Sequence, residues 1–133
     1  MKSQFHNFFK FNFQVTIKSI DAHWTVMRRF RQFRDLHMAM MSNFGQTVTV
    51  IPFPSRKIFG NRSEQVSGER QTQLMAYINV LLLTLLKIPT CPIYKNPTRD
   101  GVLQLSAFFQ PDAKEATENV NNTSSNSTND HES

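Results

Sequence analysis

Near the N-terminus, aromatic and aliphatic residues occupy every second position of a short run, which is the clearest strand pattern in the sequence. The alternating apolar residues are Phe9, Phe11, Phe13, Val15 and Ile17. Because successive side chains of a strand point to opposite faces, this alternation predicts a strand with one buried face. A turn at residues 19–23, which contains Asp21, and a second strand at residues 24–30 would complete an antiparallel hairpin.

The apolar period then changes from two to that of a helix. A helix is expected near residues 32–43 and ends close to Gly45, a residue suited to a C-terminal cap. Its apolar face would be formed by Phe33, Leu36, His37, Met40 and Phe44. Residues 48–51 are expected to form a third strand, and Pro52-Phe53-Pro54 would end it and begin an irregular loop through Asn61.

A second, longer helix is expected over residues 63–87, with Ser63 as its N-cap. Pro89 and Pro92 would stop it, and a short final helix is expected within residues 97–109. These elements predict the α+β class, in which a small antiparallel meander packs against a helical subdomain.

Composition divides the chain into a basic domain and an acidic tail. Residues 1–110 carry 14 basic and 5 acidic side chains, whereas residues 111–133 carry 1 basic and 5 acidic ones. The first part is long enough for one core, and its positive charge favours an anionic partner. The second part is low-complexity polar sequence and is expected to be a disordered tail.

Cysteine use bears on both redox setting and cofactors. Cys91 is the single cysteine of the sequence, so neither an internal disulfide nor a multi-cysteine zinc site can form. A reducing, cytosolic setting fits this composition. We expect no cofactor and no metal, and the absence of a Gly-rich phosphate loop or a hydrolase motif predicts that the chain is not an enzyme.

Four arginines lie within seven positions at the junction of the second strand and the first helix: Arg28, Arg29, Arg31 and Arg34. Forked guanidinium donors at a helix N-terminus suit a phosphate group. A solvated basic face is an equally good interpretation of the spacing alone.

A resemblance to a known family favours the phosphate interpretation. The run Arg28-Arg29-Phe30-Arg31-Gln32-Phe33, followed by Leu36-His37, resembles the signature of PX domains. A basic loop after Pro52 and the run Glu69-Arg70 with Leu74 and Tyr77 follow in family order. The stretch from Phe53 to Asn61 is most similar to the PX domain in the tails of endosomal kinesins. The domain would span residues 1–110.

The resemblance implies that this module recognises phosphatidylinositol 3-phosphate. Arg29 would bind the 3-phosphate, with Arg31 as a second donor. Phe30 stands where the family usually has Tyr and would stack under the inositol ring. Arg28 and Arg34 are assigned instead to general membrane attraction or to structure.

Residues of the later motifs complete the implied site. Arg56 matches the residue that holds the 1-phosphate, and Lys57 is the alternative. Arg70 matches the arginine that binds the ring hydroxyls at positions 4 and 5, which would select a headgroup with a 3-phosphate alone. Ile58 and Phe59, apolar residues beside two cations in a loop, are expected to insert into the bilayer.

One departure from the family pattern affects stability. The family begins with a three-stranded meander, and the first of these strands is apparently missing here. An exposed sheet edge would result, so poor stability and self-association through that edge are expected.

The resemblance also implies a location and a role. The chain would be a peripheral protein on the cytosolic face of early endosomes, at the membrane-docking end of a kinesin-like transport protein. The alternative is a basic module that binds protein or nucleic acid without lipid specificity. Nucleic acid is not the expected partner, because no RNP1, KH or zinc-finger pattern accompanies the basic and aromatic residues.

Overall fold

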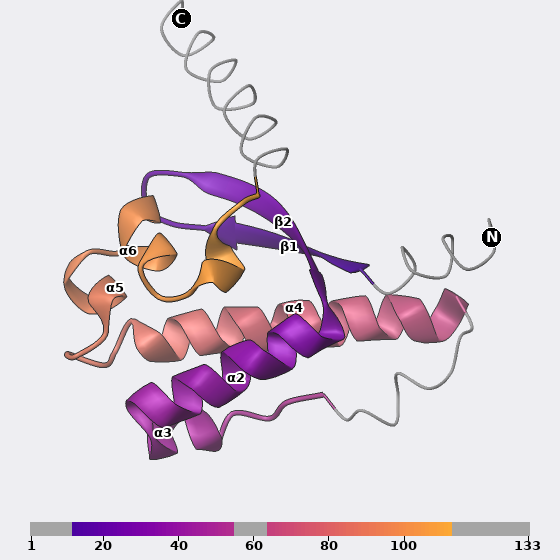
Figure 1. Ribbon diagram of the computed structural model, residues 1–133, viewed down its shortest axis with the longest axis horizontal. Coiled ribbons are helices and arrows are strands. Elements are labelled where there is room, and N and C mark those ends of the chain that lie inside the picture. The colour runs from indigo at the N-terminus through magenta and orange to yellow at the C-terminus, as the bar shows by residue number, and fades with distance from the viewer. Residues whose placement is uncertain (1–11, 55–63, 113–133) are drawn as a thin grey trace, which may run out of the picture.

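The computed structural model describes residues 12–54 and 64–112 of the chain. Two strands are followed by helices of very unequal length, which confirms the expected α+β class (Figure 1). The elements are β1 (Asn12–Lys18), β2 (His23–Arg29), α2 (Phe30–Phe44), α3 (Gln46–Thr49), α4 (Glu64–Leu85), α5 (Pro92–Lys95), α6 (Arg99–Leu103) and the 3-10 helix η2 (Ala107–Phe109).

The expected hairpin is confirmed within the described residues. β1 and β2 pair antiparallel with Val15 opposite Val26 at the centre of the register. Both strands bury every second side chain, as the alternating pattern predicted. The buried face consists of Phe13, Val15, Ile17, Trp24 and Val26. Phe9 and Phe11, the first residues of the predicted strand, lie outside the described residues.

The two longer helices also agree with the apolar spacing. α2 buries Phe33, Leu36, His37 and Met40, and it ends at Gly45, which has a φ of 66°. A residue without a Cβ adopts this left-handed conformation at little cost. α4 buries a stripe formed by Arg70, Leu74, Tyr77, Ile78, Leu81 and Leu85. Ser63, the predicted N-cap of α4, lies outside the described residues.

The predicted third strand at residues 48–51 is wrong, because the chain forms the short helix α3 there. Gly45 turns the chain sharply, and the backbone N–H groups of Val48 and Thr49 then donate to its carbonyl oxygen at 3.1 Å each. Val48 becomes fully buried in this helix. Local hydrogen bonds and burial of one side chain therefore outweigh the strand preference of the β-branched residues.

The C-terminal third differs from the prediction in its detail. Pro92, expected only to stop the preceding helix, begins α5, a position at which its missing N–H is harmless. The single helix expected within residues 97–109 is divided into α6 and η2. Figure 1 shows these short helices gathered between the hairpin and the C-terminal half of α4.

Arg28 joins residues 108–110 to the sheet through hydrogen bonds. It extends the buried face of β2, and its guanidinium donates to the carbonyl oxygens of Phe108 (2.8 Å), Gln110 (2.6 Å) and Met27 (2.7 Å). Trp24 Nε1 adds a 2.8 Å bond to the carbonyl oxygen of Phe109. Of the two roles considered for Arg28, the structural one is therefore found, and this arginine faces away from the solvent.

We predict that Arg28→Ala destabilises the domain. Hydrogen bonds to a charged group contribute on the order of 1.5–3 kcal/mol each, so the free energy of unfolding should fall by at least about 2 kcal/mol. Urea denaturation followed by circular dichroism measures this loss. Arg34→Ala, which removes an exposed arginine of α2, should change stability by less than about 0.5 kcal/mol. Equal stability of the two variants would contradict the structural role of Arg28.

Candidate functional site

The junction of β2 and α2 presents Arg29 and Arg31 to solvent. Arg29 is the N-cap residue of α2 with extended backbone angles, and Arg31 lies in the first turn. Both are exposed. The side chain of Gln32 accepts a 2.8 Å hydrogen bond from the Arg29 backbone N–H and closes the first turn. The start of a 15-residue helix thus carries two exposed guanidinium groups near its positive dipole end.

An aromatic cluster of Phe30, His37, Phe53 and Tyr77 lies directly behind these arginines. The Phe30 ring is tilted against that of Phe53 at a centroid distance of 5.6 Å, and Phe53 stacks on His37 at 5.0 Å. Tyr77 meets Phe53 edge to face at 5.0 Å, and its hydroxyl lies 2.7 Å from His37 Nδ1. The cluster therefore joins α2, residues 51–54 and α4, and the side chain of Phe30 packs against it.

Burial sets the ionisation of the polar members of this cluster. It lowers the pKa of His37 and raises the pKa of Tyr77. Both side chains are therefore neutral near pH 7, and a single hydrogen bond joins them without a charge. His37 is the partly buried core residue that its place on the apolar face of α2 indicated.

Arg70 has a different environment from the other site residues. Its side chain is 1 % exposed, on the α4 stripe that also carries Leu74 and Tyr77. Burial lowers the pKa of its guanidinium, which nevertheless stays charged as arginines in proteins do. Within residues 12–54 and 64–112 its buried Nε atom has no hydrogen bond, although the side chain has a further interaction.

The register of the sheet brings Arg70 and Arg29 to the same end of the molecule. Asn12 at the start of β1 pairs with Arg29, and Gln14, two residues along, is bonded through its backbone to Gln71 of α4. Arg70 precedes Gln71 in the helix. Arg29, Phe30 and Arg31 are thus grouped at the junction of β2 and α2, and Arg70 lies on the neighbouring part of α4.

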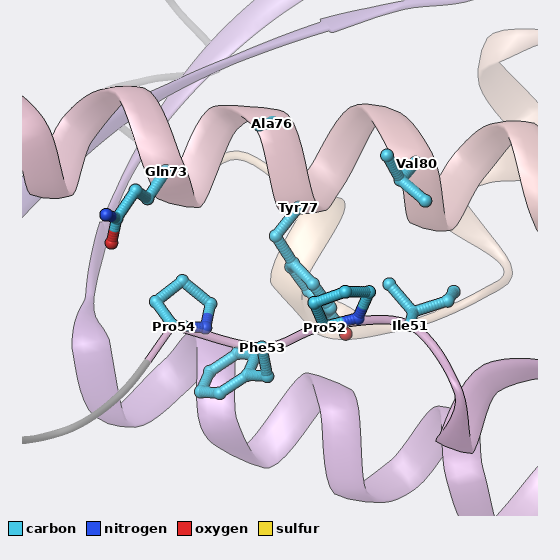
Figure 2. A pocket seen from close by; sticks show the side chains of 8 residues that line it. All are labelled: Ile51, Pro52, Phe53, Pro54, Gln73, Ala76, Tyr77 and Val80. Atoms are coloured by element: carbon cyan, nitrogen blue, oxygen red, sulfur yellow. The ribbon is translucent and has the colours of Figure 1, made fainter.

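A cavity of about 400 Å³ opens beside the aromatic cluster (Figure 2). The residues 51–54 form one wall and α4 the other, through Gln73, Ala76, Tyr77 and Val80. None of these side chains is charged, so the cavity does not suit a phosphate group. Among the described residues no arginine lines it, and it shares Phe53 and Tyr77 with the aromatic cluster.

Four predicted site residues lie in the sequence between Pro54 and the start of α4. Arg56 and Lys57, expected to hold the 1-phosphate, and Ile58 and Phe59, expected to insert into the bilayer, lie outside the described residues. Their roles stay predictions.

Two contributors to the site were not among the predicted site residues. Phe53 was expected only to end a strand, yet it is the ring that contacts Phe30, His37 and Tyr77. Its place between two prolines was the available signal, since a large apolar residue there has a fixed backbone from which to pack. No sequence pattern pointed to Gln71, because an isolated glutamine on a helix is ordinarily a solvated residue.

Comparison with known proteins identifies the family. The PX domain matches residues 17–96, which are more than half of the chain and include β2, α2 and α4. The chain belongs to the PX domain family. As a member, it is a phosphoinositide-binding module that targets proteins to membranes, and such a module is not an enzyme.

The relatives include kinesin-like proteins and a sorting nexin. The kinesin-like protein Klp98A of Drosophila melanogaster is 36% identical over 105 residues, which are 75% of this chain and 8% of that protein. The kinesin-like protein KIF16B of Mus musculus is 31% identical over the same length and shares. Sorting nexin-13 of Mus musculus is 30% identical over 59 residues, 44% of this chain and 6% of that protein. The chain therefore spans less than a tenth of these relatives.

Peripheral association with membranes agrees with the family. Within the described part of the chain, no helix is both long and apolar enough to cross a bilayer.

We predict that the domain loses stability as the pH falls below about 6.5, the ordinary pKa of histidine. The unfolded chain then takes up a proton at His37 that the folded chain does not, because burial lowers the pKa of the folded-state imidazole. Urea unfolding at pH 7.5 and pH 5.5 measures the difference. His37→Gln, which keeps a hydrogen-bonding partner for Tyr77 but cannot titrate, should lose most of this pH dependence. An unchanged dependence in that variant would assign the effect to other groups.

Proposed function

We propose that this PX domain recognises phosphatidylinositol 3-phosphate on the cytosolic face of early endosomes. The observation that carries the proposal is the start of α2, where Arg29 and Arg31 are exposed beside Phe30 and Arg70 lies at the same end of the sheet. Positive charge is concentrated there, and Phe30, which lies between the two exposed arginines in the sequence, packs against the aromatic cluster. Such preorganised, forked donors favour a compact phosphate over a diffuse anionic surface.

Each residue has a distinct part in this proposal. Arg29 binds the 3-phosphate, with Arg31 as a second donor, and the Phe30 ring supports the inositol face. Arg70 meets the ring hydroxyls at positions 4 and 5. A site built to hydrogen-bond these hydroxyls rejects a headgroup in which they are replaced. This contact would therefore discriminate against headgroups that are also phosphorylated at position 4 or 5. Arg56 or Lys57 holds the 1-phosphate.

The wider role is proposed from the relatives. Since two of them are named kinesin-like proteins, we propose that the chain acts as the membrane-docking end of a kinesin-like transport protein. Self-association through the outer edge of β1 is a further expectation. The side chain of Gln71 already occupies part of that edge at Gln14, which limits the length open to a second strand.

We predict that Arg29→Ala weakens binding to vesicles containing phosphatidylinositol 3-phosphate by about tenfold or more, because it removes charge-assisted hydrogen bonds to the phosphate. Flotation of the full chain with phosphatidylcholine vesicles, with and without each phosphorylated inositol lipid, measures affinity and selectivity. Arg34→Ala is the matched control, an exposed arginine further along α2, and should lose far less.

Two outcomes of that experiment would count against the proposal. Undiminished binding by Arg29→Ala would show that the 3-phosphate does not bind at the start of α2. Tighter retention on single-stranded DNA than on these vesicles at the same salt would favour the nucleic-acid alternative instead.

We further predict that the double variant Ile58→Ala, Phe59→Ala loses vesicle binding and monolayer penetration while it still binds a soluble, short-chain form of the lipid. Apolar side chains gain about 25 cal/mol per Å² on leaving water, so insertion of two of them contributes several kcal/mol. Isothermal titration and a monolayer balance separate the two effects. A variant that unfolds, or that loses the soluble lipid equally, would place these side chains in the core.

A further inference from the structure

The side chain of Gln71 makes an unusual contact for a residue on the body of a long helix. Its Oε1 accepts a hydrogen bond from the backbone N–H of Gln14 at 3.1 Å, and its Nε2 donates to the carbonyl oxygen of the same residue at 2.5 Å. One amide group thus pairs with both backbone groups of one strand residue. This is the pairing that a neighbouring strand would otherwise supply.

The contact lies on the outer edge of β1. In an antiparallel pair, each strand residue turns both of its backbone groups either toward its partner strand or away from it. Gln14 directs both of them to Gln71, away from β2. Asn12, about 7 Å further along the strand, pairs directly with Arg29. The amide of Gln71 therefore fixes α4 to the sheet close to the phosphate-binding end.

A second contact fixes α4 to α2. The hydroxyl of Tyr77 bonds to His37, and Tyr77 lies seven residues, or about 10 Å, beyond Arg70 on the same buried stripe. Gln71 is adjacent to Arg70 and turned by about 100° around the helix, toward β1. The two contacts together constrain the rotation of α4 about its axis and its position along that axis, at the turn that carries Arg70.

We propose that Gln71 is a positioning residue for headgroup recognition: its double hydrogen bond to the β1 edge holds Arg70 in register with Arg29. The inference rests on the proposed function, in which these two arginines bind one headgroup. Gln71 itself does not touch the lipid. A buried guanidinium has few alternative orientations, so a small rotation of its helix turn would misplace its donors.

The contact has a competing explanation. A polar side chain bonded to a strand edge protects that edge from pairing with another strand, whatever the neighbouring residue does. The two explanations differ in what the loss of the contact changes: lipid recognition in one case and oligomeric state in the other.

The test compares Gln71→Met, which keeps the length and removes both hydrogen bonds, with Arg70→Ala and with the double variant, all in the full chain. Gln71→Asn, whose amide is one methylene too short to reach the strand, serves as a second variant if the methionine variant does not fold. Gln104→Ala is the matched control, since Gln104 is an exposed glutamine at the C-cap of α6, beside the short C-terminal helices. Thermal unfolding of each variant sets a temperature at which all of them are folded.

Binding is measured on phosphatidylcholine vesicles that carry either phosphatidylinositol 3-phosphate or phosphatidylserine. We expect Gln71→Met to bind the first kind about three- to tenfold more weakly and the second kind as the wild type does. A change that only lowered the folded fraction would reduce both equally. We also expect the double variant to bind no more weakly than Arg70→Ala, because misplacing an absent side chain has no effect.

Each of the following results would overturn the inference. Wild-type binding by Gln71→Met, or losses that add in the double variant, would separate Gln71 from Arg70. New dimers in size-exclusion chromatography with unchanged lipid binding would assign the contact to edge protection. If Arg70→Ala binds normally, or the wild type does not prefer the 3-phosphate vesicles, the proposed function fails first and the role of Gln71 fails with it.

Discussion

The stacking of Phe53 on His37 is the contact on which the site depends, because it lies where three separate segments meet. α2 contributes His37 and Phe30, the segment of residues 51–54 contributes Phe53, and α4 contributes Tyr77. The His37–Tyr77 hydrogen bond also restricts how the rings of this cluster can pack. If the rings shifted, each of these buried polar groups would lose its hydrogen-bonding partner.

The basic cluster contains two kinds of arginine that differ in burial. Arg28 and Arg29 are adjacent in the sequence, and the alternation of β2 turns the first toward the core and the second toward solvent. Arg28 satisfies carbonyl oxygens of the C-terminal segment, whereas Arg29 caps α2 and is exposed. Adjacent residues of one strand thus carry a structural charge and an exposed charge, and the exposed one is the charge that we propose binds the headgroup.

Periodicity in the sequence was enough to predict the hairpin and the two long helices, because apolar spacing reflects which faces are buried. Residues 48–51 were mispredicted because strand preference is weak next to a local turn at Gly45 that leaves Val48 buried. The arginine motif predicted a candidate site, but the contacts of Arg28 and Gln71 could not be read from it. Both depend on backbone groups of distant segments, Phe108 in one case and Gln14 in the other, and no local pattern records such pairs.

The most direct test of a single headgroup site is a titration of isotope-labelled protein with a soluble, short-chain phosphatidylinositol 3-phosphate, followed by two-dimensional NMR. The largest shift changes are expected at Arg29, Phe30 and Arg31 and, in the same saturating phase, at Arg70. Lys87, which follows the C-terminal end of α4, and Lys95, the last residue of α5, should be unaffected. Shifts confined to those lysines, or separate saturation at Arg29 and Arg70, would contradict the site.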